Sequence, residues 1–243
     1  MHTISIFVDK NRMPKPASYF ECQTHLAKNL RNAANFIIRN LRTGLKKTPD
    51  TRTANENEVL ETVRIGIEMA NEKLLKDVDR LTKQLKNLPA NDPARTKIQK
   101  RIENKQKNHP SMPTSDHWML TYETLDAVMK NTKNPDYYAM PSQVNQQILR
   151  KVLKDWKSYF EALALYRQNP ERFKSQPKQP GYIKTPYTTV TFTNQVAKRS
   201  DIRGKMYITF PRCLVPVCVG KPEGSYVRTE VKPCYGGYMI YVT

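Results

Sequence analysis

The chain has 243 residues and carries 41 lysines and arginines against 22 acidic residues, a formal charge of +19. This excess favours an acidic polymer as the partner, because it is larger than solubility alone requires. Hydrophobic residues make up 38% of the chain, enough to form a core over part of its length. No segment approaches 18 consecutive apolar residues, which argues against a membrane span, and the first ten residues do not have the pattern of a secretory signal.

The cysteines and histidines give no metal-binding pattern. The cysteines form no C-x-x-C pair, and the four histidines are scattered along the chain. We therefore expect no metal site and no cofactor. We also expect the protein to be cytoplasmic and nucleoid-associated. In that compartment the four cysteines are expected to be reduced thiols: Cys22, Cys213, Cys218 and Cys234.

The N-terminal segment predicts a strand followed by a long helix. Alternating side chains favour a strand over residues 2–8, and apolar residues at helical spacing predict a helix over residues 18–46. A polar stripe that includes Asn35 lies on the face opposite the apolar residues. We expect this stripe to contact phosphate through five basic side chains: Lys28, Arg31, Arg39, Arg42 and Lys46.

Residues 56–108 predict a helical hairpin with a coiled-coil seam. Apolar residues step by three or four over residues 56–88, a turn follows at 87–93, and Pro93 can begin the second helix. The segment carries a net charge of only +3. We therefore interpret it as a spacer or partner-docking arm in preference to a nucleic-acid contact.

Two further helices are expected before residue 170. Ser115 is expected to cap a helix over residues 116–130, with Trp118 on its apolar face, and residues 130–139 read as a loop. Ser142 is expected to cap a helix that runs to about Tyr166. The exposed side of this helix carries two amides followed by three cations: Gln143, Gln146, Arg150, Lys154 and Lys157. An amide can read a base edge while cations hold phosphate, although glutamine is also a neutral helix former.

After residue 170 the chain becomes basic and rich in proline, and then alternates with period two. The basic segment 171–184 interleaves cations with aromatic rings, a pattern suited to unpaired bases. We expect phosphate contacts from Arg172, Lys174, Lys178 and Lys184, and base stacking on Phe173, Tyr182 and Tyr187. Strands are expected at 189–193, 206–210, 215–219, 226–232 and 238–242, and together with residues 2–8 they predict a small barrel or twisted sheet in an α+β protein.

Catalytic motifs are lacking in the sequence. It contains no phosphate-binding P-loop, no dinucleotide fingerprint, no nucleophile elbow and no H-E-x-x-H. A metal-dependent nuclease needs carboxylates that converge on Mg²⁺, and the predicted strands carry almost none. We interpret Glu230 as part of a surface charge pair with its neighbours Arg228 and Lys232.

Four segments, in order, resemble the TnpB family of RNA-guided transposon nucleases, the relatives of compact type V CRISPR effectors. Residues 140–160 (MPSQVNQQILRKVLKDWKSYF) resemble the family's helix before a short basic loop, and Arg172-Phe173-Lys174 resembles its PRFK segment. Residues 191–195 (TFTNQ) resemble its x-F-T-N-x strand, and 208–212 (ITFPR) its L-x-L-P-K strand.

The resemblance implies a wedge resembling an oligonucleotide-binding barrel, with a helical recognition domain inserted after its first strand. On this chain that corresponds to residues 1–16 and 169–243 for the wedge and 17–168 for the recognition domain. It also implies a guide RNA and double-stranded DNA as partners. The DNA motif beside the target would be read by Ser142, Gln146, Thr193 and Asn194, with Gln143 as a weaker candidate.

In the family, a RuvC-like nuclease opening with D-x-G follows the wedge, whereas this sequence ends at Thr243. We therefore expect a recognition module that binds guide RNA and DNA and is not an enzyme on its own, with cleavage supplied by a separate RuvC-bearing polypeptide. Three alternatives stay open. One is a guide-free DNA-binding transcriptional regulator, and another is an interaction subunit that assembles a larger nucleoprotein complex through residues 56–108. The third is a degenerate or truncated fragment with no independent role.

Overall fold

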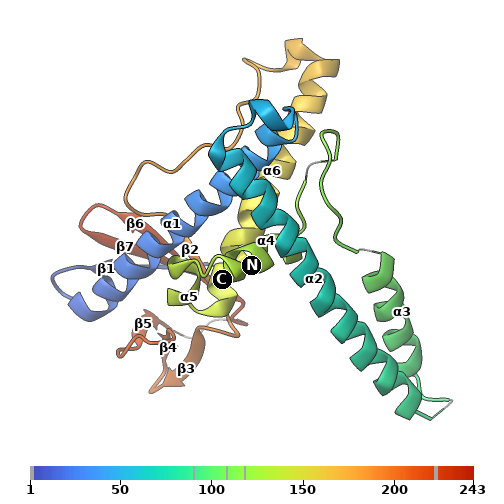
Figure 1. The fold of residues 1–243 in the computed structure, drawn as a ribbon. Coiled ribbons are helices and arrows are strands. Elements are labelled where there is room, and N and C mark those ends of the chain that lie inside the picture. The colour runs from blue at the N-terminus through green and yellow to red at the C-terminus, as the bar shows by residue number, and fades with distance from the viewer. Residues whose placement is uncertain (1–2, 90, 108, 118, 222–223) are drawn as a thin grey trace. The chain divides into compact units, whose positions relative to one another are not determined.

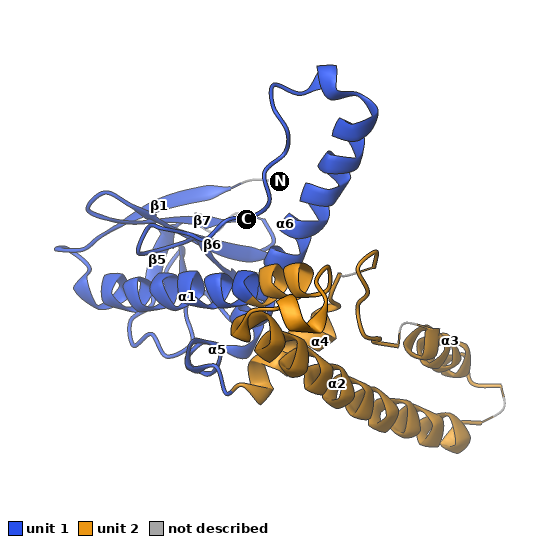
Figure 2. Cartoon of the chain, turned by 45° about the horizontal axis from the view of Figure 1, so that its top comes forward, with its two compact units in different colours: residues 1–36, 133–243 blue, residues 37–132 orange. Residues whose placement is uncertain are grey.

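The computed structural model describes residues 3–89, 91–107, 109–117, 119–221 and 224–243, and it has an α+β fold (Figure 1). The chain forms two compact units, one of residues 1–36 and 133–243 and the other of residues 37–132 (Figure 2). All of the strands found in the described residues belong to the first unit. The boundary at residues 36 and 37 falls within the first helix, inside the segment assigned to recognition from the sequence.

The first unit contains β1 (Ile4–Asp9), the first part of α1 (Pro14–Gly44), α5 (Pro135–Ala139), α6 (Ser142–Gln168) and the 3₁₀ turn η2 (Pro170–Arg172). Its remaining strands are β2 (Val190–Thr193), β3 (Lys198–Ile202), β4 (Lys205–Thr209), β5 (Val217–Gly220), β6 (Arg228–Cys234) and β7 (Gly237–Val242). The strand predicted at the N-terminus is confirmed from Ile4, while His2 lies outside the described residues.

The described strands form two antiparallel sheets, so of the predicted small barrel or twisted sheet the barrel is wrong. One sheet has the order β1-β7-β6-β2, and the other has the order β3-β4-β5. Strand β3 is not predicted by the sequence pattern, because its residues Lys-Arg-Ser-Asp-Ile lack the alternation of a half-buried strand. In the described residues β3 pairs only with β4, and β1 lies next to β5 without sharing a ladder.

An aromatic cluster forms the core between α1 and the two sheets. The ring of Phe20 on α1 meets Phe210 edge to face at 5.0 Å and Tyr238 at 5.9 Å, and Phe192 meets Phe210 at 5.0 Å. Alternation along the strands directs their apolar side chains toward this cluster. Gly237 has no side chain for a steric reason, since a Cβ there would lie 2.1 Å from the Val8 carbonyl oxygen.

One buried hydrogen bond fixes α6 against α1 within the first unit. Trp156 is fully buried, and its Nε1 donates to Asn35 Oδ1 at 2.8 Å. Asn35 Nδ2 in turn donates to the Gly181 carbonyl at 3.2 Å. Asn35 is therefore a core residue, and the sequence-based placement of Asn35 on an exposed polar stripe is wrong.

The N-terminus of α6 and the segment before it differ from the sequence prediction. Pro141 is the N-cap of α6 and Ser142 is its first residue, so Ser142 does not cap the helix through its side chain. The segment 130–139, expected to be a loop, contains α5. Its start is fixed because Asn134 Oδ1 accepts from the backbone N–H of Tyr137 at 2.9 Å.

The second unit contains the predicted helical hairpin. It is formed by α2 (Ala54–Asn87) and α3 (Ala94–Lys107), and the unit also holds η1 (Pro49–Thr51) and α4 (Tyr122–Asn131). A capping box between Thr53 and Glu56 starts α2. Lys47 Nζ donates to Glu56 Oε1 at 2.8 Å, and this bond and the Thr53 N–H lower the pKa of Glu56 to about 2.

The helix predicted at 116–130 begins later than expected. Thr121, rather than Ser115, provides the cap, because its Oγ1 accepts from the Thr124 N–H at 3.2 Å. Trp118 lies outside the described residues. Gly66 of α2 packs closely on α4, since a Cβ there would lie 2.5 Å from Val128 Cγ2.

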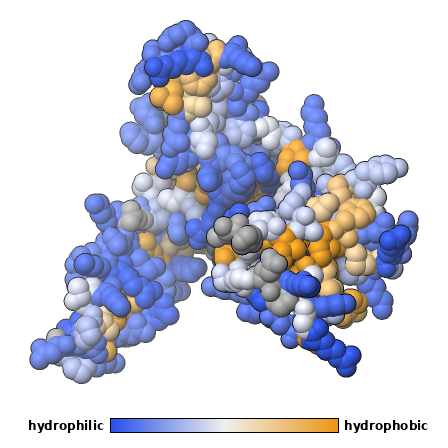
Figure 3. All heavy atoms as spheres, turned by 180° about the vertical axis from the view of Figure 1, so that it is seen from behind, coloured by the Kyte–Doolittle hydropathy of each residue, from blue (hydrophilic) through white to orange (hydrophobic). Residues whose placement is uncertain are grey.

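Most of the visible surface is hydrophilic, and apolar side chains gather on the side where the strands of the first unit lie, at the right of Figure 3. Exposed apolar residues of this unit include Phe7, Ile202, Leu214 and Val227. Among the described residues, no helix combines the length and apolar character that a membrane crossing requires.

Candidate nucleic-acid interface

The first unit holds most of the positive charge. It has 23 lysines and arginines against 9 acidic residues, a net charge of +14 out of +19. Five of these cations line one open cleft of about 540 Å³, together with only one acidic residue. The cations are Arg31, Arg150, Lys151, Lys154 and Arg228.

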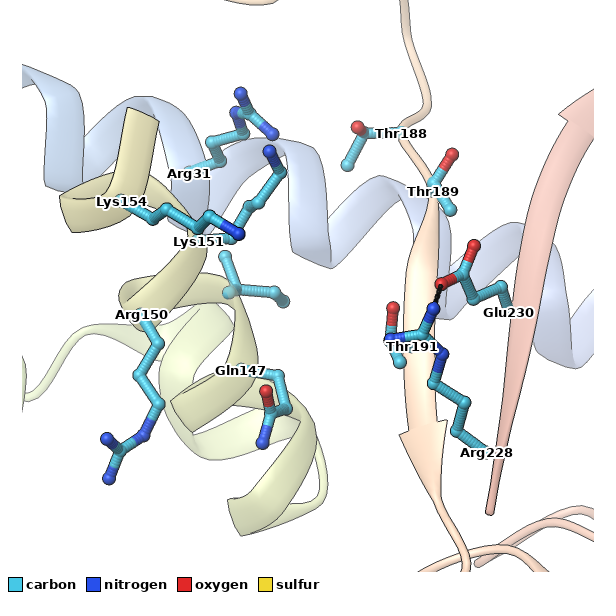
Figure 4. Close-up of a pocket in the computed structure, with 11 residues that line it drawn as sticks. Arg31, Gln147, Arg150, Lys151, Lys154, Thr188, Thr189, Thr191, Arg228 and Glu230 are labelled. Carbon is cyan, nitrogen blue, oxygen red and sulfur yellow. Dashed lines mark ion pairs between the residues drawn. The ribbon is translucent and has the colours of Figure 1, made fainter. Parts of the chain in front are cut away.

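One wall of the cleft is α6 (Figure 4). Gln147, Lys151 and Lys154 follow one another at helical spacing, so their side chains lie along one side of the helix. The opposite side of α6 is buried through Leu149, Val152 and Trp156. The amphipathic pattern that packs α6 therefore also directs its polar side chains into the cleft.

The other wall is the edge of the four-stranded sheet. Alternation along β2 buries Val190 and Phe192 and turns Thr191 outward, toward the cleft. Thr191 pairs with Glu230 of β6 in the antiparallel register. Glu230 is the acidic residue of the cleft, and its Oε1 lies 3.1 Å from Arg228 Nη2 (Figure 4).

A carboxylate outside the lining residues connects α1 to α6. Asp155 Oδ2 lies 2.5 Å from Arg31 Nη2, and Asp155 Oδ1 lies 2.6 Å from Lys151 Nζ. The side chains of Arg31 and Asp155 are about a quarter exposed, so solvent screens this pair less than a fully exposed one. Asp155 thus holds two of the cleft's cations in place and neutralises part of their charge.

Two of the expected DNA-reading residues, Gln143 at the start of α6 and Thr193 at the end of β2, are joined by a hydrogen bond. Thr193 Oγ1 donates to Gln143 Oε1 at 2.8 Å, and Gln143 Nε2 donates to Gln195 Oε1 at 2.6 Å. Asn194 lies in the turn after β2, where its Nδ2 donates to the Tyr226 carbonyl at 3.2 Å. Ser142 is exposed and Gln146 is half-buried.

The glutamines at the start of α6 differ in their surroundings. Gln143, the weaker candidate from the sequence, bonds to Thr193 at the end of β2 and to Gln195 in the turn after it, so both polar atoms of its amide have partners. Gln147, which the sequence analysis did not select, lines the cleft and is exposed. The i+4 spacing from Gln143 to Gln147 was a signal in the sequence that places both on one side of α6.

The segment 181–188 is held along α1 by side chains of that helix. Asn32 donates to the Ile183 carbonyl at 3.0 Å and accepts from the Ile183 N–H at 2.8 Å. The Thr188 N–H donates to the Thr24 carbonyl at 3.1 Å. This strap, residues 181–188, brings Thr188 and the following Thr189 to the cleft.

Tyr187 of the strap is held by the protein itself. Its hydroxyl donates to Glu21 Oε1 at 2.7 Å, which raises the pKa of Tyr187 and lowers that of Glu21. The ring also lies 5.9 Å from the Lys10 ammonium. These contacts fix the ring on α1 and compete with the base stacking expected of it.

The other residues expected on the basic segment do not line the cleft. Phe173 meets Tyr166 edge to face at 5.7 Å. The side chain of Tyr182 is 47% exposed. Exposed cations accompany these rings on the same segment: Arg172, Lys174, Lys178 and Lys184.

The basic stripe expected on the first helix divides between the two units. Arg31 lines the cleft, and Lys28 is half-buried with its Nζ 3.1 Å from Asn29 Oδ1. The remaining three belong to the second unit: Arg39, Arg42 and Lys46. On α6, Lys157 lies outside the cleft lining, 3.9 Å from Glu161 Oε1.

Within the described ranges, no three histidine, cysteine or acidic side chains lie close enough to hold a metal ion. A scan against protein-family models gives no match, and a search of the curated proteins gives none either. The resemblance to the TnpB family therefore stays a prediction from the sequence.

Proposed function

We propose that this chain is a recognition module of an RNA-guided DNA-targeting system, which binds a guide RNA and duplex DNA. In this proposal the two sheets correspond to an open oligonucleotide-binding wedge. The single observation that carries the binding part is the cleft, where five cations and three threonines face one open space with one carboxylate. Guanidinium, ammonium and hydroxyl groups are the usual ligands of nucleic-acid phosphates.

The guide-dependent part rests on the order of the TnpB-like segments. Two of these segments supply Gln143 and Thr193, which share a hydrogen bond at 2.8 Å. In the proposal, Ser142, Gln146 and Asn194 read base edges beside this bond, while the cations of the cleft hold phosphate. This arrangement supports motif reading because α6 carries Ser142 and Gln146 together with three of the cations of the cleft, Arg150, Lys151 and Lys154.

Electrophoretic shift of duplex DNA, with and without RNA co-expressed with the protein, tests the proposal. We expect binding that requires the RNA and that Gln146→Ala makes less selective for one short DNA motif. Gln84→Ala, on the exposed side of α2, is the matched control and is expected to leave selectivity unchanged. Failure to retain any RNA at low salt contradicts the proposal.

The same shift experiment distinguishes the RNA-guided function from the guide-free alternative, a DNA-binding transcriptional regulator. Tight, sequence-selective binding to duplex DNA after RNase treatment supports a transcriptional regulator and removes the need for a guide. The cleft is common to both functions, so the RNase step, rather than the loss of binding in a cleft variant, decides between them.

A further inference from the structure

The outward face of the four-stranded sheet continues the cleft. Thr191, Arg228 and Glu230 line the cleft, and they belong to the face of the sheet opposite the aromatic core. The antiparallel register extends this face in rows. Glu230 pairs with Tyr241 of β7, and Tyr241 pairs with Ser5 of β1.

The next row of the same face is apolar and basic. Lys232 pairs with Met239, and Met239 pairs with Phe7. The side chain of Phe7 is 40% exposed, and Tyr241 and Met239 are half-buried. Tyr241 and Phe7 are diagonal neighbours across the pair of strands, a relation that puts side chains about 7–8 Å apart.

We propose that an unpaired segment of RNA leaves the cleft and crosses this face, with bases stacked on Tyr241 and Phe7. The inference rests on the proposed function, because it assigns the path of an RNA that the cleft binds by its phosphates. Two rings at this spacing, with two cations on the adjacent strand β6, give a platform for successive bases. Lys232 lies in the row of Phe7, and Arg228 lies at the cleft edge.

The hydroxyls and the carboxylate at the cleft edge favour RNA over DNA. A carboxylate in a phosphate-binding cleft repels phosphate, but it accepts a hydrogen bond from a ribose 2′-hydroxyl, which DNA lacks. The side chain of Glu230 is 36% exposed and lies between Thr191 and Tyr241 in the register. Glu230 is directly opposite Tyr241 in the register. In this proposal its carboxylate therefore meets the ribose of the nucleotide whose base stacks on Tyr241.

Binding of an unstructured oligouridine to the whole chain, measured by fluorescence anisotropy, tests the path. We expect Tyr241→Leu to weaken binding about five- to tenfold, within the range found for the loss of one stacked base. Tyr241→Phe keeps the ring and is expected to bind like the wild type. Tyr207→Leu is the matched control, because Tyr207 is a half-buried tyrosine of β4 in the other sheet.

A second variant tests the RNA preference. Glu230→Ala removes a negative charge, which strengthens phosphate binding to RNA and DNA alike. The ratio of the RNA affinity to the affinity for the same sequence in DNA is therefore the quantity to measure. We expect that ratio to fall severalfold in Glu230→Ala and to stay constant in Tyr207→Leu.

The possible results separate this inference from the proposed function. If the wild type binds oligouridine and Tyr241→Leu binds equally well, the path over the sheet is wrong while the cleft proposal stands. Equal losses in Tyr241→Leu and Tyr207→Leu also overturn the path, since a sheet defect then explains both. Absence of RNA binding by the wild type overturns the proposed function and this inference with it.

Discussion

Removing two cations from the cleft is expected to change the salt dependence of binding by a calculable amount. The lining residues carry five positive charges and the Glu230 carboxylate, and Asp155 bonds to two of the cations, so the group has a net charge of +3. The double substitution Lys151→Gln and Lys154→Gln reduces this net charge to +1. Both lysines are exposed, so little stability is lost.

The magnitude follows from counterion release. Each phosphate contact with a single strand contributes about 0.7 to the slope of log affinity against log salt concentration. We take one phosphate contact for each net positive charge of the cleft. The wild type, with three contacts, then has a slope of about 2.1, and the variant, with one contact, has a slope of about 0.7. Raising the salt from about 50 to about 200 mM then weakens cleft-dependent binding about 18-fold in the wild type and about threefold in the variant.

Anisotropy titrations of a labelled oligouridine at several salt concentrations measure the two slopes. The double variant Lys83→Gln and Lys86→Gln removes the same charge from exposed positions on α2 and serves as the matched control. We expect the control to keep the wild-type slope. An unchanged slope in the cleft variant, or an equal decrease in the control, refutes the assignment of phosphate binding to the cleft.

Three further predictions concern the scaffold. Trp156→Phe is expected to lower the free energy of unfolding by about 1–3 kcal/mol, because it leaves Asn35 Oδ1 buried without its donor. Chemical denaturation measures this loss. Glu56→Gln is expected to lower the melting temperature at neutral pH. The ionised carboxylate stabilises the fold above its ordinary pKa of 4.5, and this stabilisation is lost as the pH falls through about 2, so melting curves should converge there. Asn32→Ala removes two hydrogen bonds from the strap and is expected to accelerate tryptic cleavage after Lys184 about tenfold; an unchanged cleavage rate contradicts the role of Asn32.

The sequence was sufficient where local periodicity determines the structure. The apolar spacing on α2 and α3 predicted the hairpin, and the side of α6 opposite its buried residues was predicted to be polar. Period-two alternation located five of the six C-terminal strands. It missed β3, whose polar residues carry no alternation, and it could not determine whether the ladders close into a barrel, since closure depends on pairing between distant strands.

Parts of the candidate site depend on contacts between residues far apart in the sequence. Asp155 was not selected because its bond to Arg31 joins positions 124 residues apart. Nothing in the sequence around Tyr187 indicates its bond to Glu21, which is 166 residues away. Arg228 came to the cleft through the pairing of β6 with β2, which no local pattern specifies.

Nucleic acid that co-purifies with the whole chain at low salt tests the central claim most directly. The account predicts that the wild-type protein retains a defined RNA species, identified by sequencing, and that the Lys151→Gln, Lys154→Gln variant retains much less of it while melting at a similar temperature. A wild-type protein that elutes without RNA, or a cleft variant that retains as much RNA as the wild type, contradicts the account.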